Sequence, residues 1–344
     1  MNITELLDFA VKNKASDLHL SAGLPPKYRV DGDLHNVDHA ALEKKDVASM
    51  IDSVMNDMQR KEYKEHLETD FSFQINALAR FRVNVYTQER GAAAVFRVIP
   101  TEILSMDALN LSPIFNQIAS FPQGLVLVTG PTGSGKSTTL AAIIDYINTI
   151  RYQHILTIED PIEFVHYSKN CLINQREVFR DTESFGAALR SALRQDPDVI
   201  LVGELRDLET IRLAMTAAET GHLVFATLHT SSASKTINRI IDVFPGEEKS
   251  MIRSMLSGSL QAVVAQTLLK RKGGGRIAAL EIMLCNSAIR NLIREDKIAQ
   301  MYSTIQTGKE FGMQTLDQHL TQLVHDDLIS RETARDVAIA KDLF

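Results

Sequence analysis

A glycine-rich segment directly follows an apolar run, and this pair constrains the fold of the 344-residue chain more than any other feature. Residues 130–138 read GPTGSGKST and match the pattern G-x-x-x-x-G-K-[ST]. The run GLVLVT before them predicts a buried strand, and residues 137–147 predict a helix. In this order, backbone N–H groups turn toward phosphate oxygens at a helix N-terminus. The sequence therefore predicts a nucleotide-binding loop made of Gly130, Pro131, Thr132, Gly133, Ser134, Gly135, Lys136, Ser137 and Thr138.

Two side chains of this loop can contact the nucleotide and its metal ion directly. Lys136 can reach the β- and γ-phosphates of a nucleotide, and the Ser137 hydroxyl can bind Mg²⁺. An ordinary glycine-rich turn is the alternative, but such a turn requires neither the lysine and serine nor the flanking strand and helix. We therefore expect ATP and Mg²⁺ as the cofactors.

Four short apolar runs alternate with helical segments in the second part of the chain. They cover residues 125–128, 155–158, 199–202 and 223–227. Each run is too apolar for a sheet with one face in water, so the pattern predicts an α/β fold with a parallel sheet and helices on both faces. From residue 233 onward we expect mostly helix.

The first hundred residues predict a smaller α+β domain. A helical pattern at the N-terminus and another at residues 42–67 are combined with short strand-like pieces at 17–20, 28–30, 71–75, 80–87 and 92–98. Residues 99–123 contain three prolines and no periodic face, which indicates a connector. We therefore expect domains at 1–98 and 124–344, joined by a linker at 99–123.

Acidic side chains follow two of the predicted strands in the second domain. Glu159, Asp160 and Glu163 come after the second apolar run, and Glu204 comes after the third. In a doubly wound sheet, ligands bind beyond the carboxyl ends of the strands, which is where the glycine-rich loop also begins. Many P-loop enzymes carry an aspartate before the glutamate of the third strand, but this chain has Gly203 there.

The roles of these acids follow from what hydrolysis requires. Mg²⁺ needs oxygen ligands, and the attacking water needs an acceptor for its proton. We expect Glu204, together with Ser137, to serve Mg²⁺ and Glu163 to be the general base. The division of roles with Glu159 and Asp160 stays open, and helix capping is the alternative for each acid.

Two histidines, His222 and His229, flank the fourth apolar run. A straight strand would separate them by about 23 Å at ~3.3 Å per residue, so they cannot bind one zinc ion together. We expect His229 at the phosphate edge, where it could sense the γ-phosphate. A structural hydrogen bond explains His222 equally well.

Two arginines, Arg82 and Arg97, lie on the two strands of a predicted hairpin just before the connector. In an oligomeric ATPase, an arginine from a neighbouring subunit can stabilise charge in the transition state. A solvated pair on the surface of the sheet is the alternative, and both interpretations stay open.

Composition excludes several classes of protein. The chain has 37 Lys and Arg against 43 Asp and Glu, a net charge of −6, which argues against a nucleic-acid coat protein. Its two cysteines form no CxxC pair, so we expect a reducing compartment. The apolar runs are far shorter than the ~20 residues of a membrane span, and the N-terminus does not read as a signal or transit peptide. These features predict a cytoplasmic protein.

Four sequence boxes resemble those of the secretion and type IV pilus motor ATPases. Besides the Walker A box at 130–138, ILTIEDPIEF at 155–164 resembles the family's aspartate box. DPDVILVGELRD at 196–207 resembles its Walker B box, including the missing aspartate, and TGHLVFATLHT at 220–230 resembles its histidine box. SDLHLS at 16–21 is also similar to the family, so the resemblance covers almost the whole chain.

This resemblance implies an architecture and a set of functional residues. It implies a PAS-like N-terminal domain, a RecA-like ATPase domain, a homohexameric ring and docking on an inner-membrane platform protein (PilC-like) at the pilus base. By matching positions, Lys136 and Ser137 belong to the phosphate loop, Glu163 is the catalytic glutamate and Glu204 is the Walker B acid. His222 and His229 match the histidine-box pair, and Arg82 and Arg97 match arginines that face a neighbour's nucleotide.

The segment AIRNLIRE at 288–295 resembles the pilus-retraction branch of this family. The retraction branch implies twitching motility and a possible second retraction ATPase (PilU-like) as a partner. A pilus-assembly or type II secretion ATPase is one alternative, but such members usually carry a tetracysteine zinc site that two cysteines cannot form. A nucleic-acid translocase is weakened by the acidic balance, and a non-hydrolysing scaffold by the presence of Lys136, Glu163 and Glu204 together.

Overall fold

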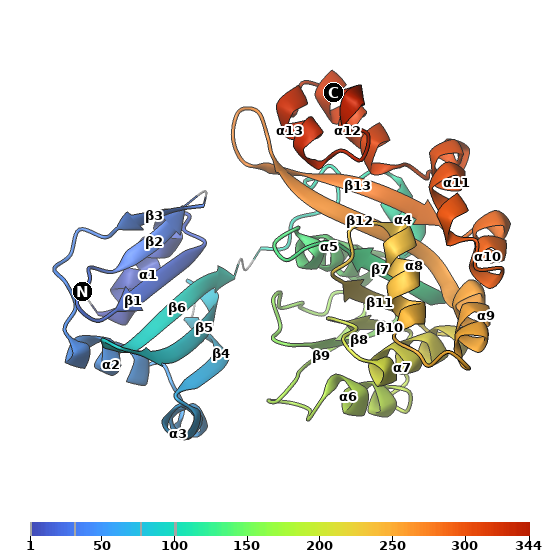
Figure 1. Ribbon diagram of the computed structural model, residues 1–344. Coiled ribbons are helices and arrows are strands. Elements are labelled where there is room, and N and C mark those ends of the chain that lie inside the picture. The colour runs from blue at the N-terminus through green and yellow to red at the C-terminus, as the bar shows by residue number, and fades with distance from the viewer. Residues whose placement is uncertain (1, 31, 76–77, 100–101) are drawn as a thin grey trace. The chain divides into compact units, whose positions relative to one another are not determined.

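Two compact units make up the chain (Figure 1). The computed structural model describes residues 2–30, 32–75, 78–99 and 102–344. Unit 1 is Met1–Glu102 and unit 2 is Ile103–Phe344. Each unit has a hydrophobic core and a β-sheet of its own.

Unit 1 is built on a six-stranded sheet in which every pairing is antiparallel. The strand order is β3-β2-β1-β6-β5-β4. The strands are β1 Asp17–Ser21, β2 Lys27–Val30, β3 Asp33–Asn36, β4 Glu68–Ile75, β5 Ala79–Gln88 and β6 Gly91–Ile99. The helices are α1 Ile3–Lys12, α2 Lys44–Asp52 and α3 Asp57–His66. This confirms the predicted α+β character of the N-terminal part.

Local sequence explains two details of unit 1. The Asn2 side chain accepts from the Glu5 N–H at 2.9 Å, and the Glu5 carboxylate accepts from the Asn2 N–H at 2.8 Å, which is a capping box that starts α1. The predicted single helical stretch at 42–67 is two helices, because Asn56 caps a new helix at α3 in the same reciprocal way with Gln59.

Unit 2 is built on a seven-stranded sheet with the order β13-β12-β7-β11-β10-β8-β9. All neighbours pair in parallel except β12 and β13, which pair antiparallel. The strands are β7 Gly124–Thr129, β8 His154–Glu159, β9 Leu172–Glu177, β10 Val199–Val202, β11 Leu223–Leu228, β12 Leu260–Lys270 and β13 Arg276–Leu284. The four predicted apolar runs are confirmed as β7, β8, β10 and β11, and the mixed α/β fold is confirmed with them.

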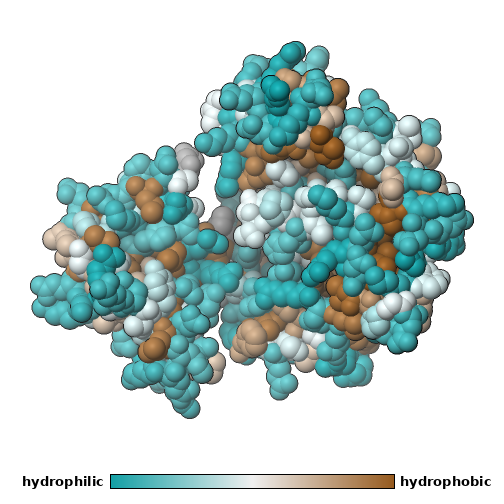
Figure 2. Space-filling view, viewed as in Figure 1, coloured by the Kyte–Doolittle hydropathy of each residue, from teal (hydrophilic) through white to brown (hydrophobic). Residues whose placement is uncertain are grey.

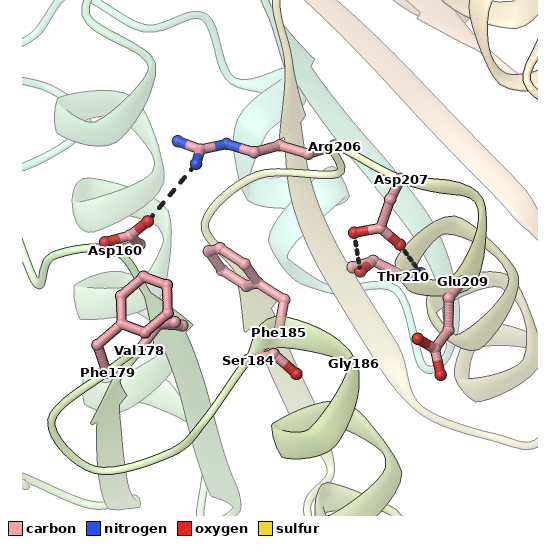
Figure 3. Close-up of a pocket in the computed structure, with 10 residues that line it drawn as sticks. All are labelled: Asp160, Val178, Phe179, Ser184, Phe185, Gly186, Arg206, Asp207, Glu209 and Thr210. Carbon is pink, nitrogen blue, oxygen red and sulfur yellow. Dashed lines mark hydrogen bonds and ion pairs between the residues drawn. The ribbon is translucent and has the colours of Figure 1, made fainter.

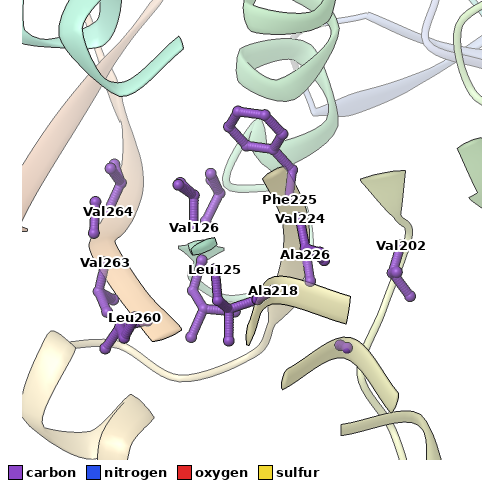
Figure 4. Packing of buried hydrophobic residues seen from close by; sticks show 14 of the residues in the cluster. Leu125, Val126, Val202, Ala218, Val224, Phe225, Ala226, Leu260, Val263 and Val264 are labelled. Atoms are coloured by element: carbon purple, nitrogen blue, oxygen red, sulfur yellow. The ribbon is translucent and has the colours of Figure 1, made fainter. Parts of the chain in front are cut away.

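Helices cover both faces of this sheet. The strand order, together with the right-handed rule for crossovers between parallel strands, puts α5 (Lys136–Ile150) on one face and α6 (Phe185–Ala192) and α7 (Leu208–Glu219) on the other. In agreement, α4 (Ile114–Ala119) packs against α5, whereas α7 packs against α6 and α9 (Lys249–Ser259). Figure 4 shows part of the core of unit 2, in which buried side chains of neighbouring strands lie beside one another, among them Leu125, Val126, Val224, Phe225 and Val263.

After residue 233 most elements are helices, as expected, but the chain also forms one hairpin that the sequence pattern does not predict. After α8 (Ala233–Asp242) and α9, the chain forms the long β12–β13 hairpin, whose pairing continues to Lys270 and Arg276 around a glycine turn. Alanine, leucine and methionine in these segments favour helix locally, but a place beside β7 buries them and supplies ladder hydrogen bonds. The remaining elements are helical: α10 Ser287–Arg294, η1 Ile298–Gln300, α11 Met301–Thr307, η2 Lys309–Phe311, α12 Leu316–His325, α13 Arg331–Val337 and η3 Lys341–Leu343.

Most of the predicted connector packs into unit 2. Residues 100 and 101 lie outside the described residues. Met106, Phe115 and Ile118 are buried in the core of unit 2, and the contacts put the division between the units at Glu102 and Ile103. Prolines mark turns as well as linkers, which is why the sequence pattern alone extended the connector too far.

Hydrophilic residues cover most of the surface of each unit on the face shown in Figure 2, with separate hydrophobic patches between them. None of the helices in the described ranges is both long and apolar enough to span a membrane.

Candidate nucleotide site

The loop between β7 and α5 is held against the neighbouring strands by its glycines. The Gly130 N–H donates to the Leu228 carbonyl at 3.2 Å, at the end of β11. A Cβ at Gly130 would lie 2.2 Å from the Gln266 carbonyl oxygen, and its φ of 143° is one that few side chains tolerate. Glycine is therefore required at this position, and the loop folds back directly against β12.

The polar atoms of the loop suit an anion. Lys136 is 9% exposed, and its Nζ donates to the carbonyl oxygens of Gly130 at 2.8 Å and Pro131 at 3.0 Å. Burial lowers the pKa of Lys136, and the nearby Glu204 and Glu163 carboxylates oppose that shift. The Ser134 Oγ is buried and has no partner among the described residues.

These observations fit a bound phosphate chain. Phosphate oxygens would supply the acceptor that the buried Ser134 hydroxyl lacks, and they would draw the Lys136 amine from the loop carbonyls. Ser137 follows at the start of α5, half-buried, where its hydroxyl could serve a metal ion on those phosphates.

Glu204 lies beyond the end of β10 and is held on both sides. Its Oε1 is 3.0 Å from His229 Nε2, and its Oε2 accepts from Arg206 Nε at 2.8 Å. The backbone around it is fixed as well, because the Leu205 N–H donates to Thr227 of β11 at 3.0 Å. The structure therefore confirms the prediction that Glu204 and His229 meet at one edge of the sheet.

Close packing explains the glycine that replaces the usual aspartate. A Cβ at Gly203 would lie 3.3 Å from both the Glu159 Cα and the Ile158 carbonyl oxygen on the neighbouring strand β8. These distances are tighter than ordinary van der Waals contact, so an aspartate would require β8 to move. Glu204 is therefore the acid at the end of β10 that can supply a carboxylate ligand.

The acids at the end of β8 and just after it differ in their surroundings. Glu159 accepts from the Thr157 hydroxyl at 2.6 Å and from Gln175 Nε2 at 3.2 Å, and burial raises the pKa of its carboxyl group to about 7. The Asp160 carboxylate is 3.5 Å from Arg206 Nη1. Glu163 is half-buried, its N–H donates to Glu159, and its charge acts on Lys136.

Arg206 connects two strand ends that the sequence treats separately. It contacts Glu204 after β10 and Asp160 after β8. In Figure 3 the guanidinium reaches across to Asp160 at the rim of a cavity of about 200 Å³. Phe179 and Phe185 line the same cavity, whose other lining residues come from the segment after β9 and from the N-terminal ends of α6 and α7.

His222 lies at the opposite end of β11 from the phosphate loop. Its carbonyl oxygen accepts from Gly124 at the start of β7, whereas the loop follows the end of β7. Its Nδ1 is 3.0 Å from the Ala217 carbonyl oxygen. The structure therefore does not bring His222 to His229, and it gives His222 the structural hydrogen bond considered for it.

Arg82 and Arg97 belong to unit 1, where they face each other across β5 and β6. Arg97 Nε donates to Asp17 at 3.0 Å, and Arg82 Nη2 donates to Asp70 at 2.9 Å. The Arg97 side chain is 62% exposed, and the Arg82 side chain is 35% exposed. The sequence-based pairing of these two arginines on one hairpin is confirmed, and their action on a neighbour's nucleotide stays a prediction.

Sequence reasoning missed three residues of this edge: Arg206, Thr139 and Gln266. Arg206 stands two positions after Glu204, and a charge so near a predicted ligand is a signal that could have been used. Gln266 is a lone amide in the apolar run AVVAQTLL. Its significance depends on β12 lying beside β7, which local sequence does not indicate.

Comparisons with known proteins show the family to which this chain belongs. The family model described as type II/IV secretion system protein matches residues 1–333. The Pseudomonas aeruginosa type IV pilus retraction ATPase PilT is 66% identical over 338 residues, which are 98% of this chain and 98% of that protein. A twitching motility protein of Neisseria gonorrhoeae is 60% identical and covers 90% of this chain and 83% of its own length.

A solved structure is similar over the whole chain. It is the crystal structure of the pilus retraction motor PilT with bound ADP, at 46% identity and a TM-score of 0.93. The match covers 100% of this chain and 99% of that one.

Proposed function

Because this chain belongs to the type II/IV secretion system protein family, we propose that it is an ATP-hydrolysing motor that powers type IV pilus retraction and twitching motility. The observation that carries the proposal is the 66% identity to a pilus retraction ATPase over 98% of both chains. The geometry of the nucleotide site supports it, since the phosphate loop, the acids that follow β8 and β10 and the histidine that follows β11 meet at one edge of the sheet.

The residues at this edge of the unit 2 sheet have different proposed roles in ATP hydrolysis. The phosphate loop and Lys136 bind and orient the nucleotide, and Ser137 and Glu204 would hold Mg²⁺. When bound, Mg²⁺ supplies neutralisation of phosphate charge. Glu163 is the proposed general base, because it is half-buried, lies near Lys136 and, unlike Glu204, is not ion-paired to a histidine and an arginine in the described contacts. His229 holds the Glu204 carboxylate from the side of β11.

The proposed assembly is a cytoplasmic homohexamer at the inner-membrane base of the pilus. In it, Arg82 and Arg97 of one subunit would stabilise charge at a neighbour's nucleotide. Its proposed partners are the inner-membrane platform protein and a second retraction ATPase. No nucleic acid is expected as a partner, since the net charge is −6.

Pilus assembly and type II secretion are the alternative functions, because ATPases that drive them would use the same hydrolytic site. The chain has only two cysteines, so it cannot form the tetracysteine site of those members, and it carries the segment AIRNLIRE of the retraction branch. These two features favour retraction.

The test is a count of surface pili and a twitching assay on source cells carrying Lys136→Ala. Without Lys136 the phosphate loop loses its cation for the β- and γ-phosphates, so ATP-driven work should stop. Retraction predicts excess pili and no twitching. Bald cells would mean that the motor drives assembly, and unchanged pili with normal twitching would exclude a pilus motor. Normal amounts of the variant in the cell are the control.

A further inference from the structure

A single polar side chain interrupts the buried apolar run of β12. Gln266 is 3% exposed, and both ends of its side-chain amide are hydrogen-bonded. Its Nε2 donates to the Ser134 carbonyl oxygen at 2.7 Å, and its Oε1 accepts from the Thr139 hydroxyl at 2.8 Å. A buried amide is costly unless both ends are bonded, and here the bonds reach the phosphate loop and the first turn of α5.

The two partners allow only one orientation of the amide. The Ser134 carbonyl oxygen can only accept, so the nitrogen of Gln266 must face it. The oxygen of Gln266 then accepts from Thr139, which is itself 2% exposed. The Ser134 carbonyl thus sets the orientation of the amide, and the bond to Thr139 holds its other end in place, so Thr139 positions Gln266 and Gln266 in turn positions the loop.

Holding the Ser134 carbonyl also fixes the direction of the next N–H group. The peptide unit is planar and trans, so the C=O of Ser134 and the N–H of Gly135 point in opposite directions. With the carbonyl bonded to β12, the Gly135 N–H points away from that strand and can donate to a phosphate. A Cβ at Gly135 would lie 2.9 Å from Gln266 Nε2, so the loop and the amide are in direct contact.

We propose that Gln266 is a positioning residue for nucleotide binding: it preorganises the Ser134–Gly135 peptide to receive a phosphate, with Thr139 holding it in orientation. The inference rests on the proposed function, since it concerns the same site. Gln266 lies behind the loop and touches no reacting atom, so its effect falls on affinity and not on the chemical step.

Gln266→Met tests the inference because methionine keeps the length and volume of the side chain but removes both hydrogen bonds. The probe is a fluorescent ADP analogue with Mg²⁺, titrated against the full chain. We expect its Kd to rise about tenfold, the effect of losing bonds worth roughly 1.4 kcal/mol. The KM for ATP should rise similarly, while kcat at saturating ATP stays within about threefold of wild type.

Thr139→Val should weaken binding of the analogue by a smaller factor, because it removes only the bond that orients Gln266. The double variant should bind no more weakly than Gln266→Met alone, because both residues act through one chain of bonds. Full additivity of the two effects would contradict this route.

Gln261→Met is the matched control. Gln261 is also a glutamine of β12 with both ends bonded, to the Gln123 carbonyl at 3.1 Å and to Arg290 at 2.9 Å, but it lies at the other end of the strand. Its variant should bind the analogue like wild type. The inference fails if Gln266→Met binds like wild type, if Gln261→Met weakens binding equally, or if Gln266→Met lowers kcat without raising Kd. If the wild-type chain itself does not bind the analogue, the proposed function fails with it.

Discussion

The two sheets of this chain present their charged residues in opposite ways. At the edge of unit 2, Lys136 and Glu204 are largely buried and each is held by two partners whose positions are fixed by neighbouring strands. On the sheet of unit 1, Arg82 and Arg97 stand directly opposite each other, and the Arg97 side chain is 62% exposed. Each of these arginines is balanced by one aspartate, Arg82 by Asp70 and Arg97 by Asp17.

This difference suggests two kinds of functional charge. The edge of unit 2 is preorganised, so its side chains can act on a ligand without much rearrangement. The arginines of unit 1 are ion-paired with Asp70 and Asp17 at a surface that water reaches, so an anion from outside can exchange with those carboxylates. If the comparison is right, substitutions at the edge stop chemistry within the subunit, and substitutions in the pair stop it only in an assembly.

The largest effect is expected for Glu163→Gln. The amide cannot accept the proton of the attacking water, so hydrolysis should fall by about 10³- to 10⁴-fold while binding of ATP persists. Phosphate release at saturating ATP measures the first effect, and titration with a fluorescent ATP analogue measures the second. Turnover near that of wild type would remove Glu163 from the role of base, and Glu159→Gln would then be the next variant to examine.

Arg97→Ala should lower hydrolysis by roughly 10³-fold in the assembled protein if the pair acts on a neighbour's nucleotide. Arg29→Ala is the matched control, because Arg29 of β2 lies opposite the same Asp17 in the strand register, on the other side of β1 from Arg97. The oligomeric state of both variants is compared by light scattering. Equal activities of the two variants in intact oligomers would reduce Arg97 to a surface ion pair.

Glu159→Gln should change stability in a pH-dependent way. The folded protein raises the pKa of Glu159 from 4.5 to about 7, because burial disfavours the charged form. Between these values the folded state binds more protons than the unfolded state, so stability falls as pH rises through this window. At pH 8 the glutamine variant should therefore be more stable by at most about 3 kcal/mol, and the difference should vanish below about pH 4.5.

Denaturant unfolding at pH 5, 6, 7 and 8 measures this difference. The exposed Glu65 of α3 provides the baseline, since Glu65→Gln removes one carboxylate from the surface of unit 1. A stability difference for Glu159→Gln that stays constant over this pH range would show that the side chain does not titrate there. The buried edge and the open face would then not differ in this respect.

Prediction from sequence succeeded where the signal is local. Strand β7 and the loop after it are recognisable because apolar run, glycines, lysine and helix are consecutive. The meeting of Glu204 and His229 followed from one rule, that parallel strands end at the same edge, and their 3.0 Å contact agrees with it. The prediction failed for β12 and β13, whose composition favours helix and whose strand character comes from pairing with β7.

By itself the sequence predicted a phosphate loop after β7, the strands β8, β10 and β11 whose ends lie near that loop, and the family that the chain resembles. These properties depend on residues that are close together in the chain and on the periodic spacing of apolar side chains, which distinguishes strands from helices. Only the tertiary structure decided that Gln266 braces Ser134, 132 positions away, and that Arg206 links two strand ends. Such contacts are set by the order of strands in the sheet, and that order arises from burial and pairing across the whole unit.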